Sequence, residues 1–499
     1  MGDGGGLKLG DDKTRILQKL AGRALRELAT MCSSGEPLWV RSVETGRNVL
    51  NYDEYVRLFR PDDDDDSGDR RRAGCSVEAS RETGVVVYLD AMQLVHAFMD
   101  PNQWKELYIS YHDLEGGDAG CHPEFHFLRH CKKLTADKWA IVDVSVDNIE
   151  PDAQTSSTAC KCLKKPSGCV IEEQSNGRCK VTWAEHATCR NAAAPSMYRA
   201  AIASGLAFVA TRWVASLQLQ YERIVFSVAT NIPARDSNGN PRLLKIVRAA
   251  WISKARRPTR SQSRIASTYV QASPHLKLAH RINSSLCRVI GSSRDLAWST
   301  QASSNRGHGV RVASRWNTGG EPSEPRGLIA CAVLSAWLQV SPAALFDFLM
   351  DESRRHEWDA MLPPGRPVRG CAVKSSAGEQ GDAWIIQDSS TNPCESTVMY
   401  APVDAAALRP VIDGHDSSGV ALLPCGFAVV PDGLEPRPTA ITSRKEEGED
   451  SKAAAEVGGS LVTVAFQVLA GSSAAADGAL PPDAVEIVAS LVSRALGNM

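Results

Sequence analysis

A long amphipathic helix predicted for residues 197–224 constrains the fold of this chain more than any other feature. No proline interrupts the segment, so at about 1.5 Å per residue the helix runs for roughly 40 Å. Apolar residues recur every three or four positions and form one stripe, which consists of Tyr198, Ile202, Leu206, Val209, Trp213, Leu217 and Tyr221. A stripe of this length needs an equally long apolar surface to cover it, either as a filled core or as the wall of a cavity.

Composition is typical of an intracellular globular protein. The 499 residues are enough for roughly two to four domains. The formal net charge of −2 gives no general attraction to nucleic acid or anionic membranes. No apolar run approaches the roughly 20 residues of a membrane span, and the first residues lack the pattern of a signal peptide. Fourteen scattered cysteines are too sparse for a disulfide scaffold and indicate a reducing compartment.

Antiparallel strands are predicted before the long helix. Residues 139–147 alternate in polarity, with Val142 on one face and Asp143 on the other, which predicts a half-buried strand. Asn176-Gly177 is a strong hairpin signal between the strands expected at 168–174 and 178–186. Further elements are expected as a helix at 14–32, a strand at 83–89 and a second helix for which Asp90 is the N-cap.

A second series of elements follows residue 325 and repeats the first. The segments "LVHAFMDPNQWKELY" (94–108) and "LFDFLMDESRRHEWD" (345–359) occupy the same place in each series, which indicates a weak internal duplication. Ser341-Pro342 supplies an N-cap and a pre-set first turn for the helix that follows it. Strands are expected at 327–340, 383–389, 396–401, 419–430 and 460–469, and a helix at 481–496. We therefore expect two α+β units, each a curved antiparallel sheet ending in a long helix.

Several long segments resemble one family. "KCLKKPSGCVIEEQSNGRCKVTWAEH" followed by "MYRAAIASGLAFVATRWVASLQLQYERI" resembles the START (steroidogenic-acute-regulatory-related lipid transfer) domain of plant class IV homeodomain–leucine zipper transcription factors, as do "EPLWV" and "VEASRETGVVV". "VMYAPVD", "VALLPCGFAVVPDG" and "GGSLVTVAFQVL" resemble the associated C-terminal region of the same family. The resemblance implies an α+β protein with a START-like helix-grip domain, in which a curved antiparallel sheet surrounds a long C-terminal helix, followed by a second, related α+β domain.

The resemblance also implies domain boundaries and a function. We expect a START-like lipid-binding domain at 11–232, a basic irregular linker or insertion at 233–275, and the START-associated C-terminal domain at 276–499. The family's helix-grip encloses a hydrophobic tunnel that binds a lipid or sterol and modulates transcription. The segment 105–133 is shorter than its family counterpart, so we expect strands to be missing there. No homeodomain or zipper precedes residue 14, so we expect no sequence-specific DNA binding by this chain.

The pocket candidates come from the hairpin strand and the long helix. Alternation places Val181 and Trp183 on the face that should meet the helix, and the helical stripe turns its own apolar residues toward them. Arg81, just before an apolar strand, is the candidate for a buried polar group that fixes a ligand head, although Glu78 could pair with it structurally instead. The predicted ligand-binding residues are Arg81, Val181, Trp183, Leu206, Val209 and Trp213. A filled core accounts for the apolar ones equally well.

Other site classes are disfavoured. His122, His126 and His130 are spaced by four, but on a strand such residues lie roughly 13 Å apart, too far for one metal ion. The cysteines at 160–189 contain no C-x-x-C pair, and no catalytic motif is present, so we expect neither a metal site nor an enzyme. A basic run is either a solvated linker or a nuclear localisation signal, and consists of Lys254, Arg256, Arg257, Arg260 and Arg264.

The sequence thus predicts a regulatory protein that binds a lipid or sterol, needs no cofactor, and lies in the nucleus, with the cytoplasm as the alternative. Its protein partners are expected among transcription factors. The alternative function is a ligand-free interaction module, or a decayed paralogue that competes for partners of the full-length factors.

Overall fold

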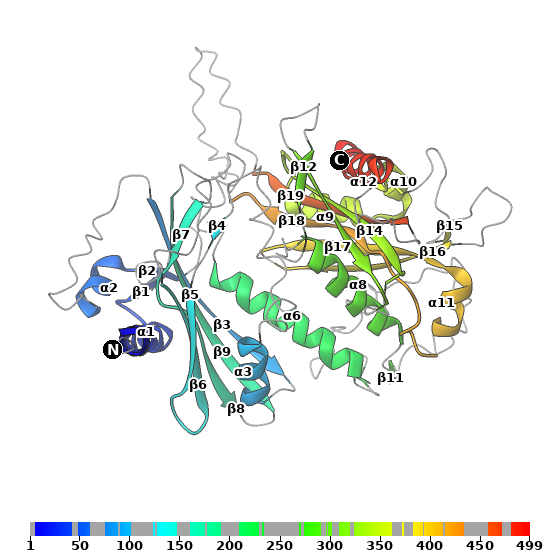
Figure 1. Ribbon diagram of the computed structural model, residues 1–499. Coiled ribbons are helices and arrows are strands. Elements are labelled where there is room, and N and C mark those ends of the chain that lie inside the picture. The colour runs from blue at the N-terminus through cyan, green and yellow to red at the C-terminus, as the bar shows by residue number, and fades with distance from the viewer. Residues whose placement is uncertain are drawn as a thin grey trace, which may run out of the picture.

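The structure of the chain is a computed structural model. The described residues are 5–41, 48–59, 75–87, 90–100, 123–124, 127–146, 160–174, 177–190, 209–228, 232–233, 269–270, 274–290, 296, 298–301, 309–319, 324–361, 372–373, 383–392, 394–412, 415–433, 458–471 and 481–499. They form two α+β domains, which Figure 1 shows side by side.

The first domain is built on a nine-stranded sheet with the order β1-β2-β3-β9-β8-β6-β5, to which β7 adds beside β9 and β4 beside β7. All pairs are antiparallel except β4 with β7. The predicted hairpin of β8 and β9 is confirmed, with Gly177 at positive φ in the turn. The strands are β1 (Trp39–Arg41), β2 (Asn48–Leu50), β3 (Cys75–Val87), β4 (Pro123–Glu124), β5 (Phe127–Lys133), β6 (Lys138–Ser145), β7 (Cys160–Lys164), β8 (Ser167–Gln174) and β9 (Arg178–Arg190).

Helices cover both faces of this sheet. α1 (Gly5–Ser33) and α2 (Tyr52–Leu58) lie on one face, where Leu28 and Met31 are fully buried. α3 (Ala91–Met99) and α6 (Ala210–Val228) lie on the other face, which we call the grip face. The expected N-cap of α3 is confirmed, because Asp90 and Gln93 form a reciprocal capping box. None of the described helices is both long and apolar enough to cross a membrane.

The long helix differs from its prediction at its start. Trp213, Leu217 and Tyr221 are buried against the sheet, which confirms the apolar stripe over that part of the helix. Val209, however, is not helical, and α6 begins at Ala210, whose backbone N–H donates to Ser80 Oγ of β3 at 2.8 Å. This bond satisfies one of the N–H groups that a helix start leaves unpaired, so the sheet fixes where the helix begins. The predicted positions 197–208 lie outside the described residues.

The predicted half-buried strand at 139–147 is wrong about its second face. In β6 the alternation itself is correct: Ala140 and Val142 face α1, while Ile141 and Asp143 face the grip. Both faces are covered, however, and Asp143 is only 1% exposed. Alternation reports which residues share a face, but it does not report whether a second layer of helix covers the polar one.

The second domain has an eight-stranded antiparallel sheet in the order β12-β13-β14-β19-β18-β17-β16-β15. α12 (Pro482–Gly497), α9 (Pro342–Met350) and α10 (Arg355–Trp358) cover one face, and α8 (Pro274–Ile290) and α11 (Ala405–Ile412) cover the other. The strands are β12 (Ser299–Gln301), β13 (Val310–Asn317), β14 (Gly327–Leu338), β15 (Ala372–Val373), β16 (Ala383–Thr391), β17 (Ser396–Asp404), β18 (Cys425–Pro431) and β19 (Ser460–Gly471).

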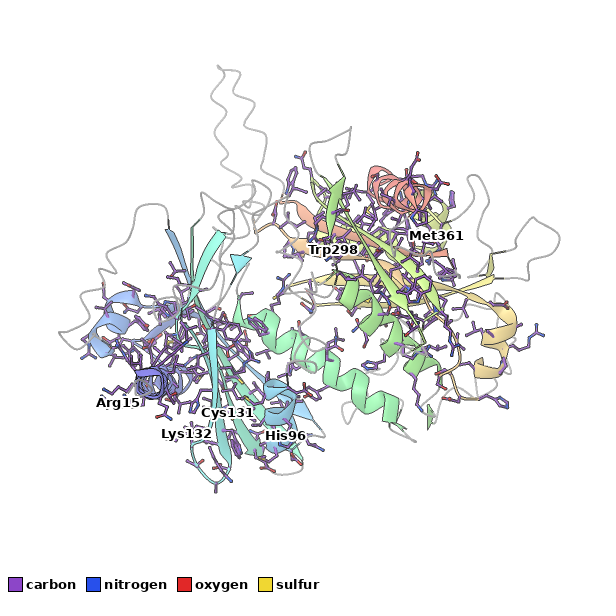
Figure 2. All side chains as sticks on the ribbon, in the orientation of Figure 1. Arg15, His96, Cys131, Lys132, Trp298 and Met361 are labelled. Carbon is purple, nitrogen blue, oxygen red and sulfur yellow. The ribbon has the colours of Figure 1, made fainter. Side chains whose placement is uncertain are left out.

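The two domains share a plan, as expected from the internal similarity. α9 is N-capped by Ser341 and buries Leu345 and Leu349, much as α3 is capped by Asp90 and buries Leu94 and Phe98. In each domain a helix near its C-terminal end packs on the sheet, and Figure 2 shows the described side chains as two clusters, one in each domain. Between the domains, β10 (Ile232–Pro233) pairs with β11 (Tyr269–Val270), and the basic run at 254–264 lies outside the described residues.

Candidate functional site

The grip face carries four charged side chains in its interior. Arg129, Asp143, Lys164 and Glu185 come from β5, β6, β7 and β9. Asp143, Lys164 and Glu185 are 1%, 4% and 0% exposed, so water reaches none of them freely. Charges this deeply buried are rare in proteins unless they pair with one another.

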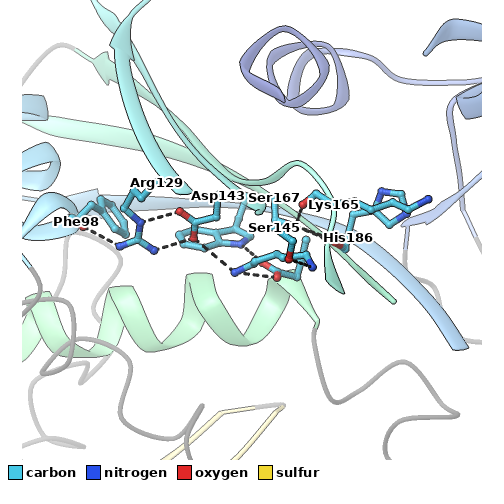
Figure 3. Close-up of polar contacts among 10 residues, drawn as sticks. Phe98, Arg129, Asp143, Ser145, Lys165, Ser167 and His186 are labelled. Carbon is cyan, nitrogen blue, oxygen red and sulfur yellow. Dashed lines mark hydrogen bonds and ion pairs between the residues drawn. The ribbon is translucent and has the colours of Figure 1, made fainter. Parts of the chain in front are cut away.

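Hydrogen bonds and ion pairs join these four side chains. Arg129 binds Asp143 in a bidentate manner, with Nε to Oδ1 at 2.7 Å and Nη2 to Oδ2 at 2.8 Å, and its Nη1 donates to the Phe98 carbonyl (Figure 3). Lys164 Nζ lies 3.6 Å from Asp143 Oδ2 and 3.2 Å from Glu185 Oε1. We refer to Arg129, Asp143, Lys164 and Glu185 as the buried ionic cluster.

Local structure holds the lysine in place. The backbone N–H of Lys164 donates to Ser145 Oγ at the end of β6, at 2.8 Å. The next residue, Lys165, donates its backbone N–H to the His186 carbonyl of β9 at 3.0 Å. These two bonds fix the end of β7 and thereby the origin of the Lys164 side chain.

The cluster is balanced in charge, with two cations and two carboxylates. Burial alone would raise the pKa of Asp143, but the Arg129 guanidinium and the Lys164 ammonium outweigh it and lower this pKa. For Glu185 burial dominates, and its pKa is raised although Lys164 is close. Each of the two cations in the cluster thus has a carboxylate beside it.

Aromatic side chains adjoin the cluster. The rings of Trp183 and Trp213 stack with their centroids 5.0 Å apart and an interplanar angle of 8°. Trp183 Nε1 donates to Glu185 Oε2 at 3.0 Å, and Lys164 Nζ lies 5.3 Å from the centroid of the Trp213 ring. Phe98 of α3 contacts Trp183 from the side. A polar group and an aromatic wall in direct contact are what an amphipathic ligand requires.

The structure brings together most of the apolar residues predicted for the pocket. Val181, Trp183 and Trp213 belong to one buried cluster on the grip face. Val209 is also buried, directly ahead of α6, while Leu206 lies outside the described residues. Their contact with a ligand stays a prediction.

Arg81 lies on the other face of the sheet, so its predicted place in the pocket has no geometric basis. It is paired across the strands with Ala184, whose side chain belongs to the cluster under α1. Its guanidinium donates to the carbonyls of Met31 and Ser34 and lies 5.3 Å from the centre of the Trp39 ring. Arg81 therefore binds the C-terminal end of α1.

Sequence reasoning missed the ionic cluster. The signal that was available is Asp143, a carboxylate in the middle of an otherwise apolar strand. If only one face of the strand is assumed to be buried, Asp143 is predicted to face solvent. Its partners Arg129, Lys164 and Glu185 lie on three other strands, and no spacing in the sequence connects them.

The histidines and cysteines form no metal site in the part of the chain that the structure describes. His130 lies on β5, which confirms a strand there, while His122 and His126 lie outside the described residues. Cys169 and Cys179 are buried on the grip face, and burial raises the pKa of Cys179 to about 11. A thiol with a raised pKa is a poor nucleophile, which fits a packing role.

Comparisons with known proteins agree with this architecture. The START domain family model matches residues 19–223, and the model of the PDF2-like C-terminal domain matches residues 273–499. The Homeobox-leucine zipper protein ROC9 of Oryza sativa subsp. japonica is 50% identical over 100% of this chain and 62% of its own length. Homeobox-leucine zipper protein GLABRA 2 of Arabidopsis thaliana is 39% identical over 98% of this chain and 65% of its own length. The chain carries a START domain and a PDF2-like C-terminal domain, and along both it is similar to homeobox-leucine zipper proteins.

These matches confirm the predicted resemblance. ANTHOCYANINLESS 2 of Arabidopsis thaliana, also a homeobox-leucine zipper protein, is 33% identical over 97% of this chain and 59% of its own length. The chain thus spans less than two thirds of the relatives that it matches. Among solved structures, the human StarD13 (DLC2) lipid transfer and protein localization domain matches 40% of this chain and 88% of that domain at 12% identity, with a TM-score of 0.17, too low to support an argument.

Proposed function

We propose that the START domain binds a lipid with a neutral, hydroxyl-bearing head, such as a sterol, and that the bound lipid regulates a transcription factor of the homeobox-leucine zipper family. The observation that supports this proposal is the buried ionic cluster beside the Trp183–Trp213 stack. A buried ion pair is weak evidence for stability, because well-packed apolar residues often do as well in its place. Three buried charges and a part-buried arginine against an aromatic wall therefore favour a binding role.

The head group is inferred from one oxygen atom. Glu185 Oε1 is buried with the Lys164 ammonium 3.2 Å away, and a carboxylate oxygen has two lone pairs, so it can accept from a second donor. A hydroxyl group would supply this donor and add no charge to the balanced cluster. A free fatty acid would bring a second carboxylate next to Glu185 and should bind less tightly.

The regulatory part of the proposal depends on the relatives, whose names identify them as homeobox-leucine zipper proteins. We propose a nuclear location for this chain on the same ground, with the basic run at 254–264 as the localisation signal and other transcription factors as protein partners. We expect no catalytic activity, no cofactor other than the bound lipid, and no sequence-specific DNA binding by residues 1–499 alone.

A titration with a fluorescent sterol tests the ligand class. Energy transfer from the tryptophans near the cluster to the sterol would report binding to the full chain. Glu185→Gln should weaken binding about tenfold, since a charge-assisted hydrogen bond contributes about 1.5 kcal/mol or more. Glu172→Gln, on the neighbouring strand and in an exposed ion pair with Lys138, is the matched control and should bind like the wild type. Equal affinity in Glu185→Gln would remove the cluster from the site.

A further inference from the structure

α6 is buried on two sides, and only one of them belongs to the START domain. Trp213, Leu217 and Tyr221 face the first sheet. A second stripe at the same spacing, Arg212, Ser216 and Gln220, is also buried, with exposures of 3%, 7% and 8%. Because adjacent helical residues point about 100° apart, Arg212 lies on a different side of the helix from Trp213.

The second domain contacts α6 on the side of Arg212. α6 and α8 pack against each other, and Figure 1 shows α6 between the first sheet and the second domain. Arg212 forms an ion pair with Glu395, with Nε 3.7 Å from Oε2 and both side chains less than a tenth exposed. Glu395 lies in the turn between β16 and β17, where Asn392 Oδ1 accepts hydrogen bonds from the backbone N–H groups of Cys394 and Glu395. The turn presents the carboxylate from a fixed backbone.

This ion pair is incomplete. None of the three guanidinium nitrogens of Arg212, nor Glu395 Oε2, has a hydrogen-bond partner among the described residues. An arginine–carboxylate pair that is fully formed has N–O distances near 2.8 Å and is often bidentate. The pair is therefore held about 1 Å too far apart for hydrogen bonding, and a small approach of α6 toward the second domain would complete it.

Arg212 is also next in sequence to a residue of the proposed ligand site. Trp213 stacks on Trp183, and Trp183 sits on β9, which is paired on both sides by β3 and β8. With ring centroids 5.0 Å apart there is no room for a third ring between them. A ligand that reaches Glu185 past this stack must displace Trp213, because β9 is hydrogen bonded to a strand on each side, whereas α6 is bound to the sheet at β3 through Ala210, Thr211 and Gln218.

We propose that α6 transmits occupancy of the START domain to the C-terminal domain through the Arg212–Glu395 pair. A lipid that enters the grip moves α6 away from the first sheet and toward Glu395, and the ion pair closes into direct hydrogen bonds. The C-terminal domain is thus the intramolecular partner that senses the ligand. This inference depends on the proposed function, since it needs a ligand in the grip.

Reciprocity makes the coupling measurable as ligand affinity. If the bound ligand strengthens the contact between the domains, then breaking that contact must lower the affinity for the ligand by the same factor. In the full chain, Glu395→Gln should weaken binding of the fluorescent sterol about fivefold, the lower end of typical couplings between sites. Glu357→Gln, which removes a carboxylate from an exposed ion pair with Arg354 elsewhere in the C-terminal domain, is the matched control and should leave affinity unchanged.

A second pair of variants keeps the test independent of folding defects in any one variant. Arg212→Gln should lower the affinity for the sterol as much as Glu395→Gln does. The double variant should bind the sterol as tightly as either single variant, because both substitutions remove the same contact. Hydrogen exchange at the backbone N–H of Glu395 should slow on addition of sterol in the wild type and not in Arg212→Gln. Sterol binding with equal affinity in all variants would overturn the coupling and leave the proposed function intact. Absence of sterol binding in the wild type would overturn the proposed function and the coupling with it.

Discussion

Asp143→Asn gives the sharpest test of the buried ionic cluster. The substitution keeps the shape of the side chain and removes its charge. Arg129 then loses the bidentate carboxylate and keeps its bond to the Phe98 carbonyl, while Lys164 keeps Glu185 at 3.2 Å. Removing one partner of a buried ion pair costs about 3–5 kcal/mol. At about 2–4 °C per kcal/mol for a domain of this size, the melting midpoint of the START domain should fall by about 6–20 °C.

The loss of stability caused by Asp143→Asn should become smaller as the pH falls. The pKa of Asp143 is lowered in the folded protein from its ordinary 3.8, so the unfolded chain binds the proton more readily. The stability that this carboxylate contributes is therefore fully present above about pH 4 and is lost as the pH falls through the folded pKa. The difference between wild type and Asp143→Asn should be largest at neutral pH and should shrink below pH 4.

Circular dichroism melts from pH 7 to pH 3 measure this difference, and hydrogen exchange in β6 and β8 assigns the transition to the START domain. Glu172→Gln again serves as the control: its ion pair with Lys138 is about a third exposed and contributes about 0–1 kcal/mol. A loss of less than 1 kcal/mol in Asp143→Asn at neutral pH, or a loss that grows as the pH falls below 4, would refute the assignment of a buried, ionised pair.

Two further predictions concern stability. Gly168→Ala should destabilise the START domain by about 1–3 kcal/mol in urea unfolding, because φ is +132° and an added Cβ would lie 2.2 Å from the Ile141 carbonyl oxygen; unchanged stability would contradict that backbone geometry. Trp39→Phe should cost more than Trp358→Phe in the same assay, since Trp39 Nε1 donates to the Met31 carbonyl at 2.8 Å, whereas Trp358 Nε1 has no hydrogen-bond partner among the described residues. A larger loss for Trp358→Phe than for Trp39→Phe would contradict the contribution of the Trp39 hydrogen bond.

Much of the fold could be predicted because local patterns carry it. The hairpin of β8 and β9 follows from Asn176-Gly177 between two strand-like runs, and α9 follows from Ser341-Pro342. The face that meets α6 was also correct, because Val181 and Trp183 alternate with polar residues along β9 and both are buried against the helix. Alternation of apolar and polar residues lies within one strand, so the sequence of that strand alone shows which residues share a face.

The site itself could not be predicted, because it depends on contacts between distant strands. Arg81 looked like a buried head-group residue in the sequence, but register with Ala184 turns it toward α1. Asp143 looked like a surface residue, and its partner Lys164 enters only because β7 leaves the main order of the sheet and pairs beside β9. A shift of one residue in register would exchange these faces, and sequence periodicity alone does not fix the register.

Native mass spectrometry of the purified full chain tests lipid binding most directly. Gentle ionisation keeps a bound lipid on the protein, and collisional release then gives the mass of the lipid itself. We expect one lipid per chain, of neutral charge and with a hydroxyl group, and we expect Glu185→Gln to carry less of it than Glu172→Gln. A spectrum with the bare chain alone, before and after incubation with sterols and other neutral lipids, would contradict a ligand-binding START domain.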